Sequence, residues 1–156
     1  MDQPGFRRAG RRAHPAVRGW ADISARRAEV LRLLLDTHVL LWGVAEPWRV
    51  PQHVAAALAS PRNTTLVSVV CLWEAAIKSG LGKLNAPANL PEIVQRHGDF
   101  RLLPIEVAHV WQVRDLPPIH RDPFDRLLIA QAMVEDMTIV TRDAWMSRYG
   151  VPTIAV

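Results

Sequence analysis

Cysteine is nearly absent from the 156-residue sequence, in which Cys71 is the only example. A single cysteine excludes an internal disulfide and is typical of proteins from a reducing compartment. The six histidines are scattered, so no cluster of histidine and cysteine has the spacing of zinc ligands. The sequence therefore excludes disulfide-stabilised secreted domains and zinc-binding domains.

Long apolar runs are also absent. No run approaches the roughly 18 residues that a membrane-spanning helix requires. The arginine-rich start is not followed by the apolar stretch of a secretory signal. Apolar residues make up 49% of the chain, an ordinary share for a globular protein, and repeats and low-complexity segments are lacking. We therefore expect a cytoplasmic protein with one core-forming domain.

Excess charge is missing from most of the chain. The net charge is +4, but residues 1–30 hold seven arginines against three acids, whereas residues 31–156 are neutral overall. A basic segment can bind nucleic-acid phosphates, yet it is more often a solvated extension. We predict that residues 1–30 are a basic, disordered and non-essential extension or result from a start site placed too early. The domain is then residues 31–156.

From residue 32 onward, short β-like runs alternate with helical patterns, which is typical of an α/β fold around a mainly parallel sheet. We predict strands over 32–36, 65–68, 101–105, 138–141 and 153–156. We predict helices over 38–45, 51–60, 69–80, 91–97, 106–116, 122–136 and 143–150. Ser68 is expected to cap the helix over 69–80.

Carboxylates recur where the predicted strands end. Asp36 ends the first strand, Asp143 follows the strand over 138–141, and Glu74 lies in the helix after the second strand. Asp122 and Asp125 open the helix over 122–136. In a parallel sheet the carboxyl ends of the strands form one edge, where ligands bind. If these strands are neighbours, the acids face one pocket.

Carboxylate oxygens are the ligands that Mg²⁺ and Mn²⁺ prefer, and crowded carboxylates repel one another until a cation binds. An acidic pocket with such a cation is suited to phosphodiester cleavage, because the cation activates water and offsets charge in the transition state. One or two cations are both compatible with the pattern. The predicted metal-binding and catalytic residues are Asp36, Glu74, Asp125 and Asp143.

Each acid also has a structural interpretation. Asp36 could cap the helix that follows it, but a carboxylate at the end of a buried strand favours function. For Asp143, capping and function both stay open. Asp122 before Pro123 has the pattern of a helix cap, so we favour structure there and keep it as a secondary site candidate. Asp125 receives the metal role, although it could instead complement the helix dipole.

The remaining candidates are weaker. Glu74 could be a surface residue, but its apolar neighbours indicate partial burial. Thr141 could position a water or a metal ligand, although an ordinary strand residue is the favoured interpretation. Four tryptophans among apolar helical residues are interpreted as core packing rather than base stacking: Trp42, Trp73, Trp111 and Trp145. Four side chains near the predicted site could contact substrate or have a local structural role: His38, His120, Arg121 and Arg126.

Four blocks, in this order and spacing, resemble a PIN domain and more closely a VapC toxin of bacterial type II toxin–antitoxin modules: LLLDTHVLLW, CLWEAAIKSGLGKL, HRDPFDRLLIAQA and TRDAWMSRYGV. The resemblance covers about residues 31–156. It implies a three-layer α/β/α sandwich, Mg²⁺- or Mn²⁺-dependent endoribonuclease activity and frequent homodimers. It also implies a VapB-type antitoxin whose helical segment blocks the site. By motif it assigns the site to Asp36, Glu74, Asp125 and Asp143, whereas the basic segment before the first strand departs from the family.

Two other classes that gather acids at strand ends fit less well. A receiver domain needs a lysine near the last strands, but the only lysines are Lys78 and Lys83. A haloacid-dehalogenase-like phosphatase needs an acid two residues after the first one, where this chain has His38. The remaining alternative is a catalytically silent PIN-fold domain that binds RNA or acts as a scaffold. RNA binding by such a domain would not need a metal.

Overall fold

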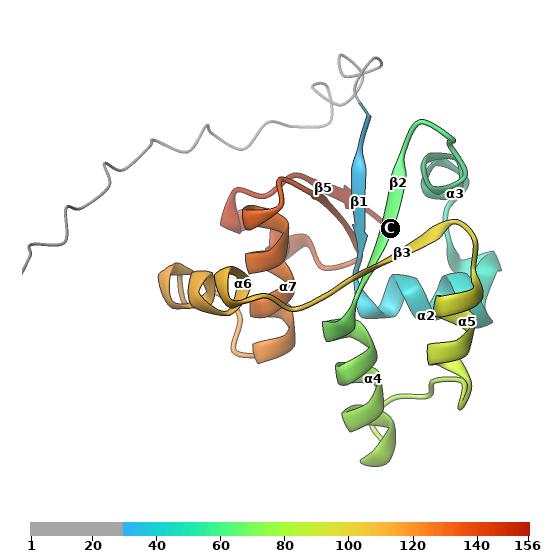
Figure 1. Cartoon of the computed structure of the whole chain (residues 1–156), viewed down its shortest axis with the longest axis horizontal. Coiled ribbons are helices and arrows are strands. Elements are labelled where there is room, and N and C mark those ends of the chain that lie inside the picture. The colour runs from blue at the N-terminus through green and yellow to red at the C-terminus, as the bar shows by residue number, and fades with distance from the viewer. Residues whose placement is uncertain (1–29) are drawn as a thin grey trace, which may run out of the picture.

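The computed structural model describes residues 30–156, which fold into a five-stranded parallel sheet with helices on both sides (Figure 1). The strands are β1 (Arg32–Leu35), β2 (Thr64–Ser68), β3 (Phe100–Leu103), β4 (Thr138–Thr141) and β5 (Thr153–Ala155). The α-helices are α2 (Thr37–Ala45), α3 (Gln52–Leu58), α4 (Val69–Gly80), α5 (Leu90–Arg96), α6 (Val107–Gln112) and α7 (Pro123–Val134). Three 3-10 helices complete the fold: η1 (Pro47–Arg49), η2 (Val113–Asp115) and η3 (Ala144–Tyr149). The predicted α/β sandwich is confirmed.

The prediction of a basic extension concerns residues 1–30, and all of these except Val30 lie outside the described residues. It therefore stays a prediction. Within residues 30–156, no helix is both long and apolar enough to cross a lipid bilayer.

The order of the strands is β3-β2-β1-β4-β5. Strand β1 pairs in parallel with β2 and with β4, and Leu35 lies opposite Val67 on one side and Val140 on the other. The chain therefore builds outward from β1 in one direction and then returns to build outward in the other. Helices α2, α3 and α5 lie on one side of the sheet, and α6 and α7 lie on the other (Figure 1). The carboxyl ends of β1 and β4 form the switch point at which ligands bind in open α/β sheets.

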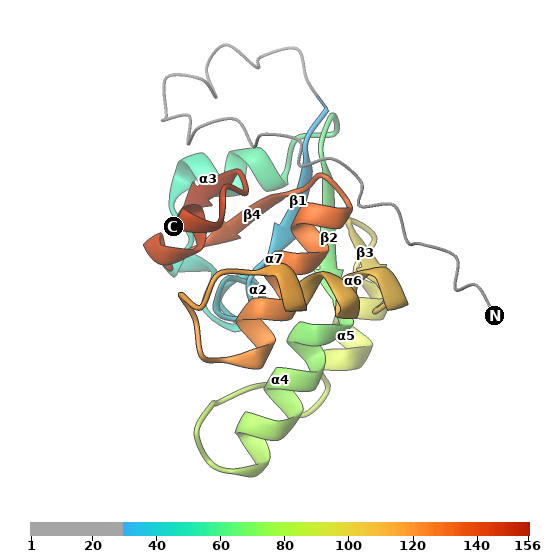
Figure 2. The same ribbon diagram turned by 90° about the vertical axis from the view of Figure 1, so that its left-hand side faces the viewer.

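Helices cover both faces of the sheet, and this explains the leucine-rich sequence of β1. Leu33, Leu34 and Leu35 are all at most 2% exposed. A strand buried on both faces has a continuous apolar run instead of alternation. Figure 2 looks onto the face that α6 and α7 cover. A charged residue directly after such a strand therefore lies in a buried position at the carboxyl edge of the sheet.

Most predicted elements are confirmed within two residues, and α4 begins at the predicted cap, where the Ser68 hydroxyl accepts a hydrogen bond from the N–H of Val70 at 3.0 Å. The predicted helix over 106–116 is wrong in its second half. Helix α6 ends at Gln112 and η2 follows. Two prolines come after η2 and cannot continue a helix. The guanidinium of Arg126 donates hydrogen bonds to the carbonyl oxygens of Val113 and Leu116. These carbonyl groups at the irregular end of the helical segment therefore have hydrogen-bond partners.

Strand β3 ends at Leu103, although the prediction extended it to residue 105. Pro104 follows, and proline has no N–H to donate to a neighbouring strand. The predicted helix over 143–150 is the 3-10 helix η3, and it ends at Gly150 in a left-handed conformation with φ of 78°.

The interpretation of four tryptophans as core residues is wrong for three of them. Trp73, Trp111 and Trp145 are 48%, 64% and 53% exposed, and Trp42 is partly buried. Their helices are short or lie at the rim, so an apolar neighbourhood in the sequence does not place the ring under another layer. Trp73 packs edge-on against Phe124 with ring centroids 4.9 Å apart, and the other three rings lie beside arginine side chains.

Candidate metal-binding site at the carboxyl edge of the sheet

Asp36 is the first residue after β1 and caps α2. Its side chain is buried, with the residue only 6% exposed. One carboxylate oxygen accepts a hydrogen bond from the N–H of His38 at 2.8 Å, and the other accepts from the hydroxyl of Thr141 on β4. Burial raises the pKa of Asp36, but these hydrogen bonds outweigh it and hold the pKa below its usual value. Asp36 is therefore a buried, ionised carboxylate at the switch point.

The hydroxyl of Thr141 connects two of the predicted site residues. It donates to Asp36 and accepts a hydrogen bond from the N–H of Asp143 at 2.9 Å. Thr141 is 2% exposed, so these are buried contacts. Thr141 is a strand residue, as the favoured interpretation had it, but its hydroxyl also contacts both acids and so helps to position them.

Asp143 caps η3, because its Oδ1 accepts from the N–H of Trp145 at 2.8 Å. The prediction that Asp143 could cap this helix is thus confirmed, and the cap uses only one of its two oxygens. That Oδ2 lies 2.8 Å from Nε2 of His120. His120 in turn has Nδ1 3.0 Å from the Tyr149 hydroxyl and donates its backbone N–H to the same oxygen. His120 therefore holds Asp143 against the turn before α7, a contact that the sequence did not predict.

Glu74 is only 5% exposed on α4, more deeply buried than predicted. One of its oxygens accepts from the hydroxyl of Thr37, and the other is paired with the ammonium of Lys78. The same ammonium lies 2.9 Å from an oxygen of Asp122. Burial lowers the pKa of Lys78, but Glu74 and Asp122 outweigh it and raise the pKa above its usual value. Sequence analysis missed Lys78 as a site residue, although its spacing of four residues from Glu74 on a helix was the available signal.

Asp122 caps α7 as predicted, because it accepts a hydrogen bond from the N–H of Phe124 at 2.9 Å. Asp125 lies one turn further along the helix and differs from the other acids. Within residues 30–156 its carboxylate has neither a hydrogen-bond donor nor an ion-pair partner. Burial raises the pKa of Asp125 to about 6, and repulsion from Asp122 and Glu74 adds to this effect. Asp125 is thus a carboxylate among carboxylates that has no ion-pair partner among the described residues, although His120 lowers its pKa slightly from a distance.

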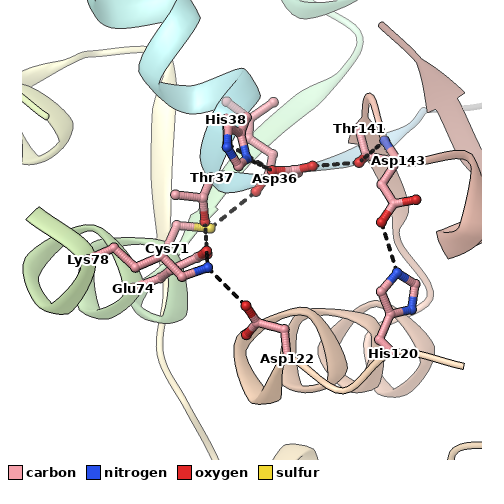
Figure 3. Close-up of polar contacts among 11 residues, drawn as sticks. Asp36, Thr37, His38, Cys71, Glu74, Lys78, His120, Asp122, Thr141 and Asp143 are labelled. Carbon is pink, nitrogen blue, oxygen red and sulfur yellow. Dashed lines mark hydrogen bonds and ion pairs between the residues drawn. The ribbon is translucent and has the colours of Figure 1, made fainter. Parts of the chain in front are cut away.

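The side chains from α2, α4, the β4 end and the start of α7 point toward one another (Figure 3). Cys71 lies under this group and donates its thiol to the carbonyl oxygen of Leu35 at 3.3 Å. Burial raises the pKa of Cys71 to about 12, so the thiol stays protonated at neutral pH and is a poor metal ligand. The available metal donors are carboxylates.

Arg126 and Arg121 were predicted near this edge with open roles. The guanidinium of Arg126 is used for backbone carbonyl oxygens, which is the structural interpretation. Arg121 is exposed beside His120, and its role stays open.

The structure brings the predicted acids to one edge of the sheet but not into a finished metal site. In the described part of the chain, no three histidine, cysteine, aspartate or glutamate side chains stand close enough to hold a metal ion together. Lys78 instead pairs with Glu74, and Nε2 of His120 lies 2.8 Å from Oδ2 of Asp143. An all-carboxylate donor set suits a hard divalent cation, and the unpaired Asp125 beside other acids is the place where added positive charge is most favourable. The residues therefore fit Mg²⁺ or Mn²⁺ in their chemistry.

The profile of the PIN domain matches residues 33–152, from β1 to the residue before β5. The chain belongs to the PIN domain family. In this PIN domain, the residues that the family resemblance assigned to the site are the acids that surround the switch point. No protein among the curated ones matches the sequence.

Solved structures share the fold of this PIN domain. VapBC2 from Rickettsia felis, bound to a DNA fragment from its promoter, aligns with a TM-score of 0.61 at 15% identity, covering 80% of this chain and 98% of that one. DNA-bound VapBC from Salmonella typhimurium aligns with 0.58 at 18% identity, covering 81% and 98%. VapBC-1 from nontypeable Haemophilus influenzae aligns with 0.56 at 13% identity, covering 80% and 98%. At these identities the likeness establishes the fold.

Proposed function

We propose that this protein is a Mg²⁺- or Mn²⁺-dependent endoribonuclease and the toxin of a VapBC-type toxin–antitoxin module. Nuclease activity is general for PIN domains. The observation that carries the proposal is the environment of Asp125, a partly buried carboxylate whose pKa is raised by burial and by repulsion from Asp122 and Glu74, and lowered only in part by His120. Such an arrangement costs stability unless a cation binds there.

Asp36, Glu74, Asp125 and Asp143 would hold the cation. When bound, a divalent cation activates water and offsets the charge that develops on the phosphodiester during hydrolysis. Asp36 is kept ionised and oriented by His38 and Thr141. Thr141 also sets the backbone of Asp143, and His120 sets its side chain. The protein thus supplies fixed carboxylates around the cleavage point, and Lys78 holds Glu74 in place before a cation binds.

A VapB-type antitoxin is proposed as the partner because the similar folds come from structures of VapBC complexes. One surface of this chain supports such a partner. Trp73, Ile77 and Leu81 are 48%, 40% and 63% exposed, and they repeat every four residues along and just beyond α4. This spacing forms an apolar stripe that suits an amphipathic helix, and it lies on the helix that carries Glu74. A homodimer remains a prediction from the family resemblance.

The first prediction concerns RNA cleavage. Purified protein, free of antitoxin, is incubated with total cellular RNA in Mg²⁺, Mn²⁺ or EDTA. Discrete fragments should form with either metal and not with EDTA. Asp36→Asn should lower the cleavage rate at least ~100-fold, because the ionised carboxylate at the switch point is lost while the size of the side chain is kept. Expression of this variant should also relieve any growth arrest that the wild type causes.

Asp99→Asn is the matched control, because Asp99 is an exposed aspartate whose side chain is 85% accessible. It should cleave at the wild-type rate. Full activity of a folded Asp36→Asn protein would contradict the mechanism. RNA binding without any metal-dependent cleavage by the wild type would favour the alternative, a catalytically silent RNA-binding domain.

A further inference from the structure

Arginine side chains lie over tryptophan rings at several places in residues 30–156. Arg148 lies closest, 3.7 Å from the ring centroid of Trp145. The remaining contacts are Arg49 and Arg142 with Trp42, at 4.7 and 5.6 Å, and Arg114 with Trp111, at 5.0 Å. A guanidinium over an aromatic ring is held in place by the ring while its N–H groups at the edge remain able to donate hydrogen bonds.

Two of these arginines already have a carboxylate partner within the protein. Arg49 is paired with Glu46 at 2.9 Å, and Arg114 is paired with Asp115 at 3.1 Å. Their positive charges are therefore partly used within the protein.

Arg142 and Arg148 are different. Both are exposed, and in the described part of the chain neither has a carboxylate or hydrogen-bond partner. Both also flank a site residue, since Arg142 directly precedes Asp143 and Arg148 lies on η3, the helix that Asp143 caps. Two guanidinium groups without such a partner thus belong to the segment that carries one of the site carboxylates.

The contact between Arg142 and Trp42 extends this arrangement toward Asp36. Trp42 belongs to α2, the helix that Asp36 caps. Arg142 therefore connects the helix that Asp36 caps with the segment that carries Asp143. A phosphate bound by Arg142 would lie next to that segment.

An RNA strand would be repelled by the crowded carboxylates of this site. Guanidinium groups next to the acids can offset that repulsion, and their planar N–H edges match phosphate oxygens in pairs. We infer that Arg142 and Arg148, held over Trp42 and Trp145, form the binding site for the RNA phosphates that flank the cleaved bond. This inference rests on the proposed ribonuclease function and names the side chains that position its substrate.

The test measures binding separately from cleavage. A fluorescein-labelled 20-nucleotide oligouridylate is titrated with the full-length protein in EDTA, and anisotropy is followed between 50 and 200 mM salt. The Arg142→Ala/Arg148→Ala variant should raise Kd at least tenfold. The slope of log K against log salt should fall by about 1.4, since each phosphate contact to a single strand contributes about 0.7.

Two further variants separate this role from a general loss of charge. Arg114→Ala is the control, because it removes an equally exposed arginine from a tryptophan ring but one that Asp115 already neutralises. Its Kd should stay within twofold of the wild type. Trp145→Ala should weaken binding while its salt slope stays at the wild-type value, because the ring orients Arg148 and carries no charge. Trp145→Phe should restore most of the affinity.

Cleavage assays with Mg²⁺ then distinguish the inference from the function beneath it. A rise in KM for the double arginine variant supports the inference. If the wild type cleaves RNA and the double variant has unchanged Kd and KM, the inference is overturned and the ribonuclease stands. If the wild type does not cleave but the variant loses binding, the ribonuclease is overturned and the phosphate site stands. Loss of binding to an acidic protein partner, with RNA binding intact, would also overturn the inference.

Discussion

Asp125 is the least compensated charge at the carboxyl edge of the sheet. The other acids each have a donor or a cation, whereas Asp125 faces other carboxylates and a partly buried environment. A residue that is unfavourable for folding and still present is expected to serve function.

Asp125→Asn should therefore stabilise the metal-free protein while it abolishes cleavage. The pKa of Asp125 is raised from 3.8 to about 6, so ionisation opposes folding. The penalty is absent below pH 4, grows between pH 4 and 6, and is complete at pH 7.5. We expect the variant to gain about 1–2 kcal/mol in free energy of unfolding at pH 7.5 in EDTA. Urea denaturation at pH 7.5 and at pH 4 measures this gain.

Asp99→Asn again serves as the control, and its free energy of unfolding should change by less than about 0.5 kcal/mol at both pH values. An Asp125→Asn protein that is less stable than the wild type at pH 7.5 would show that Asp125 is stabilised by contacts within the protein. That result would remove the main support for a cation at this position.

At the level of single residues, the acids lie at the carboxyl edge of the sheet as predicted, whereas three of the four tryptophans are not core residues. Position relative to a strand end was enough to select Asp36, because the end of a parallel strand has a fixed place in the fold. A tryptophan among apolar neighbours has no such constraint. Trp145 lies on a 3-10 helix at the rim with 53% of its surface exposed. Burial of a ring depends on what covers the helix, and that comes from distant parts of the chain.

Helix α7 begins at the site, and its first turn has both structural and functional residues. Asp122 accepts the N–H of Phe124 and pairs with Lys78 on α4. Asp125 lies in the same turn, and repulsion from Asp122 and Glu74 adds to the effect of burial on its pKa. The ion pair of Asp122 with Lys78 thus connects the start of α7, where Asp125 lies, to α4, which carries Glu74.

Two variants of Asp122 separate the cap from the ion pair. Asp122→Ala should lower the free energy of unfolding by about 1–2 kcal/mol, because it removes the cap and the contact with Lys78. Asp122→Asn keeps a good capping side chain and loses only the charge, so it should cost under about 1 kcal/mol. Urea denaturation at pH 7.5 compares the two. Equal losses for both variants would mean that the cap contributes nothing.

The elements themselves were largely predictable, because caps, prolines and apolar runs act locally. Ser68, Asp122 and Gly150 each mark a helix end that the structure confirms. The order of the strands was not predictable in this way, since periodicity does not say which strands become neighbours. The placement of β1 between β2 and β4 is a tertiary property, and it is this placement that brings Asp36 next to Thr141.

For the whole molecule, repulsion among the carboxylates of the site lowers the stability of the fold, and a bound cation would reduce this repulsion. A ligand that binds only the folded state stabilises it by about 1.4 kcal/mol at ten times its Kd. We expect saturating Mn²⁺ to raise the Tm of the wild type by about 3–6 °C, measured by circular dichroism against EDTA. Asp36→Asn should lose most of this rise. An equal rise in both proteins would place the cation elsewhere.

The central position of β1 has a consequence for protein synthesis. Strand β1 lies near the start of the domain, but its second neighbour, β4, is separated from it by about a hundred residues of chain. Until residues 138–141 have left the ribosome, Asp36 has no Thr141 to orient it, and Asp143 is not yet available. An incomplete chain therefore cannot assemble the carboxylate site. If the protein is a toxin, its own translation is protected from it until β4 and Asp143 have left the ribosome.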